Sequence, residues 1–190
     1  MANAQTTEKP SYLGLLNAIS LGESENGVAL EAWAKATRDE DLAAALRLVA
    51  ARETSHGEVF CRRLAELGYS LRPKADPGAA ERRAKLADPN TSDLEKIPTR
   101  REEAADPFAE IRRRMAEGDF DPMTVNLMNW YIAEEKDSER RLRDAYDKVR
   151  KGTRAVDAPS ADALAIMACM TAGFAKLEKS IEKLAKAKKN

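Results

Sequence analysis

The distribution of proline constrains the fold of this chain more than any other feature. Eight prolines occur in 190 residues, and they leave three long proline-free stretches, at 11–72, 123–158 and 160–190. Proline costs about 3 kcal/mol inside a helix but is tolerated in the first turn. The three stretches are rich in Ala, Leu, Glu, Lys and Arg, which favour helices, and no segment alternates like a strand. The sequence therefore predicts an all-α protein.

Capping residues divide these stretches into individual helices. Asp39 or Asp41 can cap a second helix inside the first stretch, and Gly68 can end that helix. Asp121 followed by Pro122 is typical of a helix start. The predicted helices span about 11–36, 39–68, 107–117, 122–151 and 160–186.

Long helices joined by one long connection suggest a particular architecture. We expect a single domain over 1–190, an antiparallel four-helix bundle with an extra or short helix. The long crossover covers about 69–120, where proline, aspartate and arginine are frequent and helical patterning is weak. Before the short helix at 107–117, we expect at most one further helix in this crossover.

Composition excludes several classes of function. Lys plus Arg and Asp plus Glu both number 32, so the chain lacks the positive surplus typical of nucleic-acid binding. The two cysteines, Cys61 and Cys169, lie far apart and outside any CxxC pair. This spacing excludes a disulfide framework, a zinc knuckle and a rubredoxin-type iron site within the chain.

No segment reads as a signal or a membrane span. The first ten residues have no apolar core, and the cleanest apolar run, at 163–170, is too short to cross a bilayer. We therefore expect a cytoplasmic protein that contacts no membrane.

Three predicted helices each carry a carboxylate on an otherwise apolar face. These residues are Glu23 in the first helix, Glu53 in the second and Glu135 in the helix at 122–151. His56, the only histidine, follows Glu53 by three residues and shares its face. Burying an unpaired carboxylate costs several kcal/mol, and several that face one another repel unless a cation lies between them. Carboxylate and imidazole ligands suit iron or manganese, so the pattern predicts such a metal site.

The same residues resemble a known family. Glu53-Thr-Ser-His56 and the segment LLNAISLGESENGVALEAWAKAT at 15–37 resemble the first two helices of rubrerythrin-like proteins in the ferritin-like superfamily. The segment AEEKDSERRL at 133–142 resembles the second Glu-x-x-His helix of that family. The resemblance covers about 11–68 closely and about 120–150 less closely. It implies a ferritin-like bundle, a dimetal-carboxylate site, iron-dependent oxidase or peroxidase-like chemistry and a homodimer.

The chain departs from the family pattern at two places. Ser138 stands at the second histidine position, and a neutral hydroxyl is a poor iron ligand, so the resemblance implies an incomplete site. The third-helix carboxylate of the family falls near residue 105, where Glu102 and Glu103 are the candidates and Glu95 is a more distant one. In an alternative register, the helices at 122–151 and 160–186 are the third and fourth helices of the bundle, and the second motif is absent.

We therefore expect Glu23, Glu53 and His56 to hold one iron or manganese ion, with Glu135 bridging or completing the site. No catalytic residue is assigned, and the electron donor is not identified, because the chain lacks the rubredoxin module of full rubrerythrins. The alternative is a metal-free helical scaffold or dimerisation module. In that case His56 is an ordinary core residue, and Glu23 and Glu135 form buried ion pairs with Arg52 or Arg141.

Overall fold

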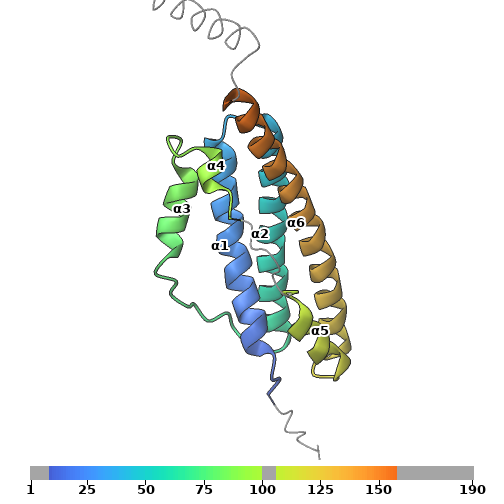
Figure 1. Cartoon of the computed structure of the whole chain (residues 1–190). Coiled ribbons are helices and arrows are strands. Elements are labelled where there is room, and N and C mark those ends of the chain that lie inside the picture. The colour runs from blue at the N-terminus through green and yellow to red at the C-terminus, as the bar shows by residue number, and fades with distance from the viewer. Residues whose placement is uncertain (1–8, 100–105, 158–190) are drawn as a thin grey trace, which may run out of the picture. The chain divides into compact units, whose positions relative to one another are not determined.

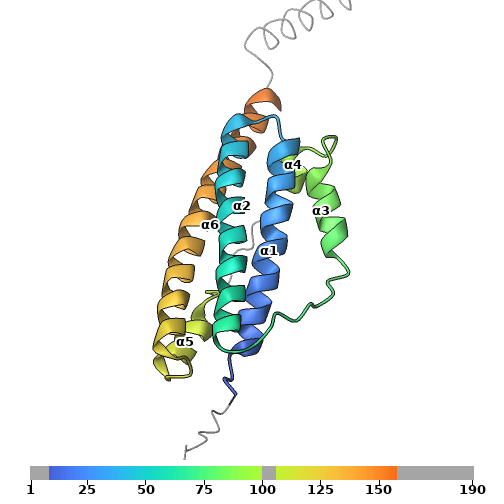
Figure 2. The same ribbon diagram turned by 180° about the vertical axis from the view of Figure 1, so that it is seen from behind.

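Three long helices form the body of the protein. The computed structural model describes residues 9–99 and 106–157. Within them, α1 (Leu13–Ala36), α2 (Glu40–Glu66) and α6 (Pro122–Asp157) lie side by side, as Figures 1 and 2 show from opposite directions. The described part of the chain contains no strand, and the predicted all-α, ferritin-like helical fold is confirmed.

Helix α2 runs antiparallel to both of its long neighbours. Only residues 37–39 separate α1 from α2, so the chain must reverse its direction there. Arg63, near the end of α2, binds Asp121 at the start of α6 with a nitrogen–oxygen distance of 2.7 Å. At the opposite ends of these helices, Lys148 of α6 binds Asp41 of α2 at 2.8 Å. Helix α6 is therefore parallel to α1.

The bounds of α1, α2 and α5 lie within two residues of the predicted ones, whereas α6 continues to Asp157 and not only to about residue 151. The Asp39 side chain accepts a hydrogen bond from the Leu42 amide at 2.9 Å and so caps α2. Gly68 follows α2 with a φ of 81°, the left-handed conformation that favours glycine. Asp121 accepts hydrogen bonds from the amides of Met123 and Thr124 and caps α6.

The connection between α2 and α6 contains more helix than expected. It holds α3 (Ala79–Ala87), α4 (Asp93–Lys96) and α5 (Ala109–Ala116), so two helices precede α5 where at most one was predicted. Ser92 and Glu95 form a capping box that stabilises the short α4. In Figure 1, α3 and α4 lie near the upper part of α1, and α5 lies near the lower ends of the long helices.

Two apolar clusters fill the bundle, one toward each end. The first contains residues from the start of α1, the end of α2 and the first half of α6: Tyr12, Leu13, Leu16, Ile19, Phe60, Leu64, Phe120, Met128, Tyr131 and Ile132. The second contains residues from the opposite ends of these helices and one residue after α4: Trp33, Ala34, Leu42, Leu46, Ile97 and Ala145. The carboxylate positions of all three helices lie between the two clusters.

The connection also bears on the two registers that the sequence left open. Ile97 belongs to the second cluster and Phe108 packs against the first, so these two residues lie toward opposite ends of the bundle. Helix α6 then starts beside the end of α2 and runs antiparallel to it. This direction favours the register in which α6 is the fourth helix of the family pattern.

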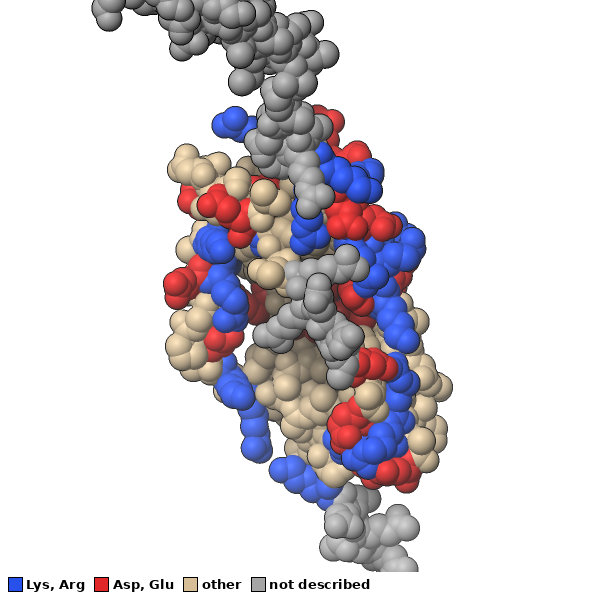
Figure 3. Space-filling model, in the orientation of Figure 1, with Lys and Arg blue, Asp and Glu red and all other residues tan. Residues whose placement is uncertain are grey.

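The chain divides into two compact units, residues 1–149 and residues 150–190. The predicted helix at 160–186 lies outside the described residues, and the expectation of a single domain stays a prediction. None of the described helices has the length and apolar character needed to cross a membrane. On the face shown in Figure 3, Lys and Arg are interspersed with Asp and Glu, and no broad surface of one sign is visible.

Candidate metal centre

The four residues predicted to bind metal lie together in the middle of the bundle. Glu23 extends from α1, Glu53 and His56 from α2, and Glu135 from α6. One donor atom from each lies within 4.8 Å of the donor atoms of the others. His56 is fully buried, Glu53 is 5% exposed and Glu23 is 7% exposed.

Two glycines bring α1 close enough to α2 to assemble this cluster. A Cβ atom on Gly57 would lie 3.0 Å from the backbone oxygen of Ser20, and one on Gly27 would lie 3.0 Å from the backbone oxygen of Ala50. The buried Ser20 hydroxyl donates to the Gly57 carbonyl at 2.7 Å. Glycine permits this close approach, because a side chain at either position would press against the backbone of the facing helix.

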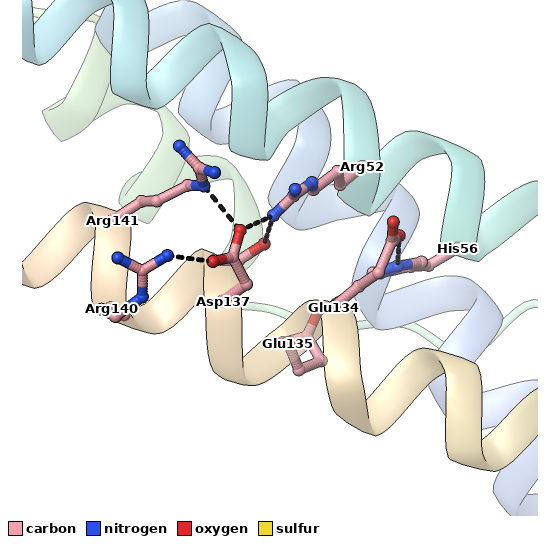
Figure 4. Close-up of polar contacts among 8 residues, drawn as sticks. Arg52, His56, Glu134, Glu135, Asp137, Arg140 and Arg141 are labelled. Carbon is pink, nitrogen blue, oxygen red and sulfur yellow. Dashed lines mark hydrogen bonds and ion pairs between the residues drawn. The ribbon is translucent and has the colours of Figure 1, made fainter.

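The His56 ring is held from both sides. Its Nε2 lies 2.9 Å from Glu134 Oε2, the contact drawn in Figure 4. Its Nδ1 lies 3.2 Å from Glu135 Oε1 and 3.6 Å from Glu23 Oε2. When Nε2 carries the proton and donates to Glu134, the Nδ1 lone pair faces the carboxylates.

Three buried atoms of the cluster have no hydrogen-bond partner. They are Glu23 Oε2, His56 Nδ1 and Glu135 Oε1, which approach one another without the geometry of a hydrogen bond. Buried polar atoms are almost always satisfied, so atoms that converge on one place call for an additional partner. A divalent cation fits this arrangement because it accepts electron pairs from oxygen and nitrogen together.

Tyr131 holds the Glu23 carboxylate with one oxygen facing His56. Its hydroxyl donates to Glu23 Oε1 at 2.7 Å, which leaves Oε2 as the oxygen that faces His56. The Tyr131 and Trp130 rings both contact His56 edge-on, with centroid separations of 5.1 and 4.9 Å. These aromatic rings restrict the movement of the imidazole.

The pKa values reflect the concentration of acidic groups in a buried place. Burial, together with the hydrogen bond and charge of Glu23, raises the pKa of Glu53 to about 9. Burial lowers the pKa of His56, but Glu135, Glu23 and Glu134 outweigh it and raise that pKa to about 10. The metal-free cluster therefore retains protons at neutral pH, and a bound cation would displace them.

The alternative ion pairs with arginine do not form at the carboxylates for which they were considered. The guanidinium groups of Arg52 and Arg141 both bind Asp137 instead, at 2.9 and 2.5 Å. Figure 4 shows these contacts beside Glu134 and Glu135. Glu23 and Glu135 thus keep oxygens directed at His56.

The residues fit one metal ion better than two. Ser138 is buried at the second histidine position, and its hydroxyl accepts a hydrogen bond from Arg52. Glu95 is exposed, and its carboxylate accepts a hydrogen bond from the Ser92 amide, so Glu95 does not join the centre. Glu102 and Glu103 lie outside the described residues. Among the residues that the structure describes, a dimetal centre like that of the family therefore has a ligand cluster for one ion only.

Sequence reasoning missed Glu134 as the partner of the second His56 nitrogen. The available signal was the pair of adjacent glutamates at 134–135, since a metal-binding imidazole usually donates its other N–H to a carboxylate or a carbonyl. The hydrogen bond from Tyr131 to Glu23 could not be predicted either, because it requires the packing of α6 against α1.

Comparison with known proteins supports the fold. A family model described as Rubrerythrin matches residues 15–146, which include all four candidate ligands. The curated proteins gave no significant match, and the solved structures gave none.

Proposed function

Because the chain belongs to the rubrerythrin family, we propose that it binds one iron or manganese ion through Glu23, Glu53, His56 and Glu135. The observation that carries this proposal is the convergence of three buried atoms that lack hydrogen-bond partners, Glu23 Oε2, His56 Nδ1 and Glu135 Oε1. Carboxylate oxygens and an imidazole nitrogen form a ligand set typical of iron and manganese.

We further propose that the loaded protein carries out redox chemistry on dioxygen or peroxide. The bound ion would supply the change of oxidation state that this chemistry needs. The surrounding residues have separate tasks: Glu134 orients the His56 ring, and Tyr131 orients Glu23 by hydrogen bonding to Oε1. The two apolar clusters exclude water from the ends of the centre, which strengthens electrostatic interactions there.

Metal analysis tests the binding proposal directly. The protein is loaded anaerobically with Fe(II) or Mn(II) and freed of excess metal. The metal content per chain is then measured by inductively coupled plasma mass spectrometry. Wild type should retain metal, and His56→Ala should lose it. Glu25→Gln is a matched control, because Glu25 lies two residues from Glu23 but forms a surface ion pair with Arg83. Metal at background level in the wild type contradicts the proposal.

A second candidate is a metal-free scaffold, and the interaction between Arg52 and Ser138 at the second metal position favours it. A scaffold retains no metal under any loading condition. It also makes Glu53→Gln neutral or stabilising, because the substitution removes a carboxyl group buried beside Glu23. A chain that loses its metal with Glu53→Gln instead supports the metal centre. Peroxide consumption by the iron-loaded chain then tests the redox proposal.

A further inference from the structure

We propose that the Arg52 guanidinium takes the place of a second metal ion, so that the centre holds one ion and a fixed organic cation. This inference rests on the proposed metal site and concerns its stoichiometry and affinity. The family resemblance implies two metal ions, so the difference belongs to this chain's own residues.

The position of Arg52 carries the inference. It directly precedes Glu53 on α2, and its Nη1 reaches across to α6, where it lies 3.2 Å from Ser138 Oγ. Ser138 is 2% exposed and lies one helical turn beyond Glu135. The guanidinium therefore contacts the residue that stands at the second histidine position of the motif, one helical turn from Glu135.

Arg52 is also fixed in this position. The same Nη1 lies 2.9 Å from Asp137 Oδ2, and Figure 4 shows the side chain extended from α2 to this carboxylate. The Arg52 side chain is 22% exposed, so solvent screens its charge only partly. The guanidinium is held in one orientation by its hydrogen bond to the Ser138 hydroxyl and its ion pair with Asp137, both on α6.

Asp137 does not neutralise this charge completely. Its carboxylate also binds Arg140 and Arg141, so three guanidinium groups share one negative charge. Arginine stays protonated at all physiological pH values. The net positive charge that remains offsets part of the repulsion among Glu23, Glu53 and Glu135, and it opposes the entry of a second divalent cation.

A titration with Mn(II), followed by metal analysis, tests the inference on the full chain. Wild type should bind one Mn(II) per chain. Arg52→Gln removes the fixed cation and should bind Mn(II) about tenfold more tightly. Arg52→Lys retains the charge and should bind like the wild type. Arg143→Gln is the matched control, because Arg143 is an exposed arginine of α6 that pairs with Glu139 and not with Asp137.

A second variant, expected to change the Mn(II) affinity in the opposite direction, keeps the test informative if Arg52→Gln fails to fold. Asp137→Asn removes the negative charge next to Arg52 and should weaken Mn(II) binding. Circular dichroism establishes that each variant is folded. The electron paramagnetic resonance spectrum of the loaded wild type should be that of isolated Mn(II), without the exchange coupling of a bridged pair.

The possible outcomes distinguish a failure of this inference from a failure of the proposed metal binding. Two coupled ions per wild-type chain overturn the inference and leave the metal-binding function intact. No bound ion overturns both. One ion per chain, with Arg52→Gln equal to or weaker than wild type, shows that Arg52 does not act as a substitute cation. One ion with tighter binding by Arg52→Gln supports the inference.

Discussion

At the scale of single residues, His56 shows how one side chain depends on several helices. Its Nδ1 faces carboxylates from α1 and α6, while its Nε2 contacts Glu134 of α6. A ring nitrogen binds metal only when the proton is on the other nitrogen, so the Glu134 contact selects the useful tautomer. We therefore expect the contact to raise the metal affinity of the proposed centre, although Glu134 is not one of the four candidate ligands.

Glu134→Gln should lower the affinity for Mn(II) about tenfold and leave the fold intact. The amide oxygen can still accept a hydrogen bond from Nε2, but it lacks the charge that makes the imidazole a stronger base. Titration calorimetry measures the change. Glu139→Gln is the control, since its exposed carboxylate binds only Arg143 among the contacts seen. Equal affinities for the two variants would contradict a role for Glu134.

At the scale of helices, the close contact between α1 and α2 positions Glu23. The backbone oxygen of Ser20 lies 3.0 Å from a Cβ atom placed on Gly57, and a backbone oxygen cannot rotate away as the nearby Ser24 hydroxyl can. A larger residue at position 57 must therefore shift α1 itself. Because Glu23 lies one turn after Ser20, this shift would move its carboxylate relative to His56.

Gly57→Ala should destabilise the metal-free chain by about 1–3 kcal/mol, even though alanine is the better helix former. It should also weaken Mn(II) binding. Urea unfolding and metal titration measure the two effects. Gly22→Ala, next to Glu23, has no atom within 4 Å of the added methyl group, so this control should be stabilised by about 0.5–1 kcal/mol. If both variants are stabilised, the close contact does not constrain the helices.

The start of α6 joins all three long helices through one carboxylate. Asp121 accepts hydrogen bonds from Tyr12 at 2.5 Å, from Arg63 at 2.7 Å and from the Thr124 hydroxyl at 2.5 Å. Burial alone raises the pKa of Asp121, but the bonds from Thr124, Tyr12 and Arg63 outweigh it and hold that pKa well below its usual value. This contribution to stability is fully present above pH of about 4 and is lost as the pH falls toward the folded-state pKa.

Asp121→Asn should lower the free energy of unfolding at pH 7 by about 1–2 kcal/mol, through a weaker cap and a lost ion pair. Below pH of about 4, its stability should decline less steeply than that of the wild type. Urea unfolding at a series of acidic pH values measures both effects. Asp119→Asn, which removes an exposed ion pair with Arg114, should change stability little. Parallel acid profiles for wild type and Asp121→Asn would contradict this assignment.

At the scale of the whole molecule, metal binding and folding are linked. The candidate ligands come from α1, α2 and α6, so an ion that binds all of them requires the folded bundle. A ligand that binds only the folded state raises the free energy of unfolding according to its concentration and affinity. An ion bound at the proposed centre would therefore hold the three helices together.

Mn(II) at one hundred times its dissociation constant should stabilise the chain by about 2.7 kcal/mol, equivalent to roughly 5–10 °C in the melting temperature. A chelator should reverse the shift, and His56→Ala should show none. Differential scanning calorimetry at several Mn(II) concentrations measures the effect. A wild-type melting temperature that does not respond to millimolar Mn(II) would contradict the proposed centre.

The sequence by itself determined the helices and the faces on which the carboxylates lie. Proline spacing and the caps at Asp39 and Asp121 act within a few residues, so the bounds of α1, α2 and α5 agree with the predicted ones to within two residues. Helical periodicity likewise placed Glu23, Glu53 and His56 on buried faces. Such features depend on local backbone geometry, which nearby residues control.

Only the tertiary structure decided which groups meet. In the metal-free alternative, Arg52 or Arg141 pairs with Glu23 or Glu135, but Arg52 extends to Asp137 and Ser138 on α6. Glu134, which precedes the predicted ligand Glu135, contacts His56 Nε2. The partners of long, flexible side chains depend on the rotation and spacing of neighbouring helices, which are set by packing contacts such as those of Gly27 and Gly57. Those contacts join residues distant in the chain, and no local pattern encodes them.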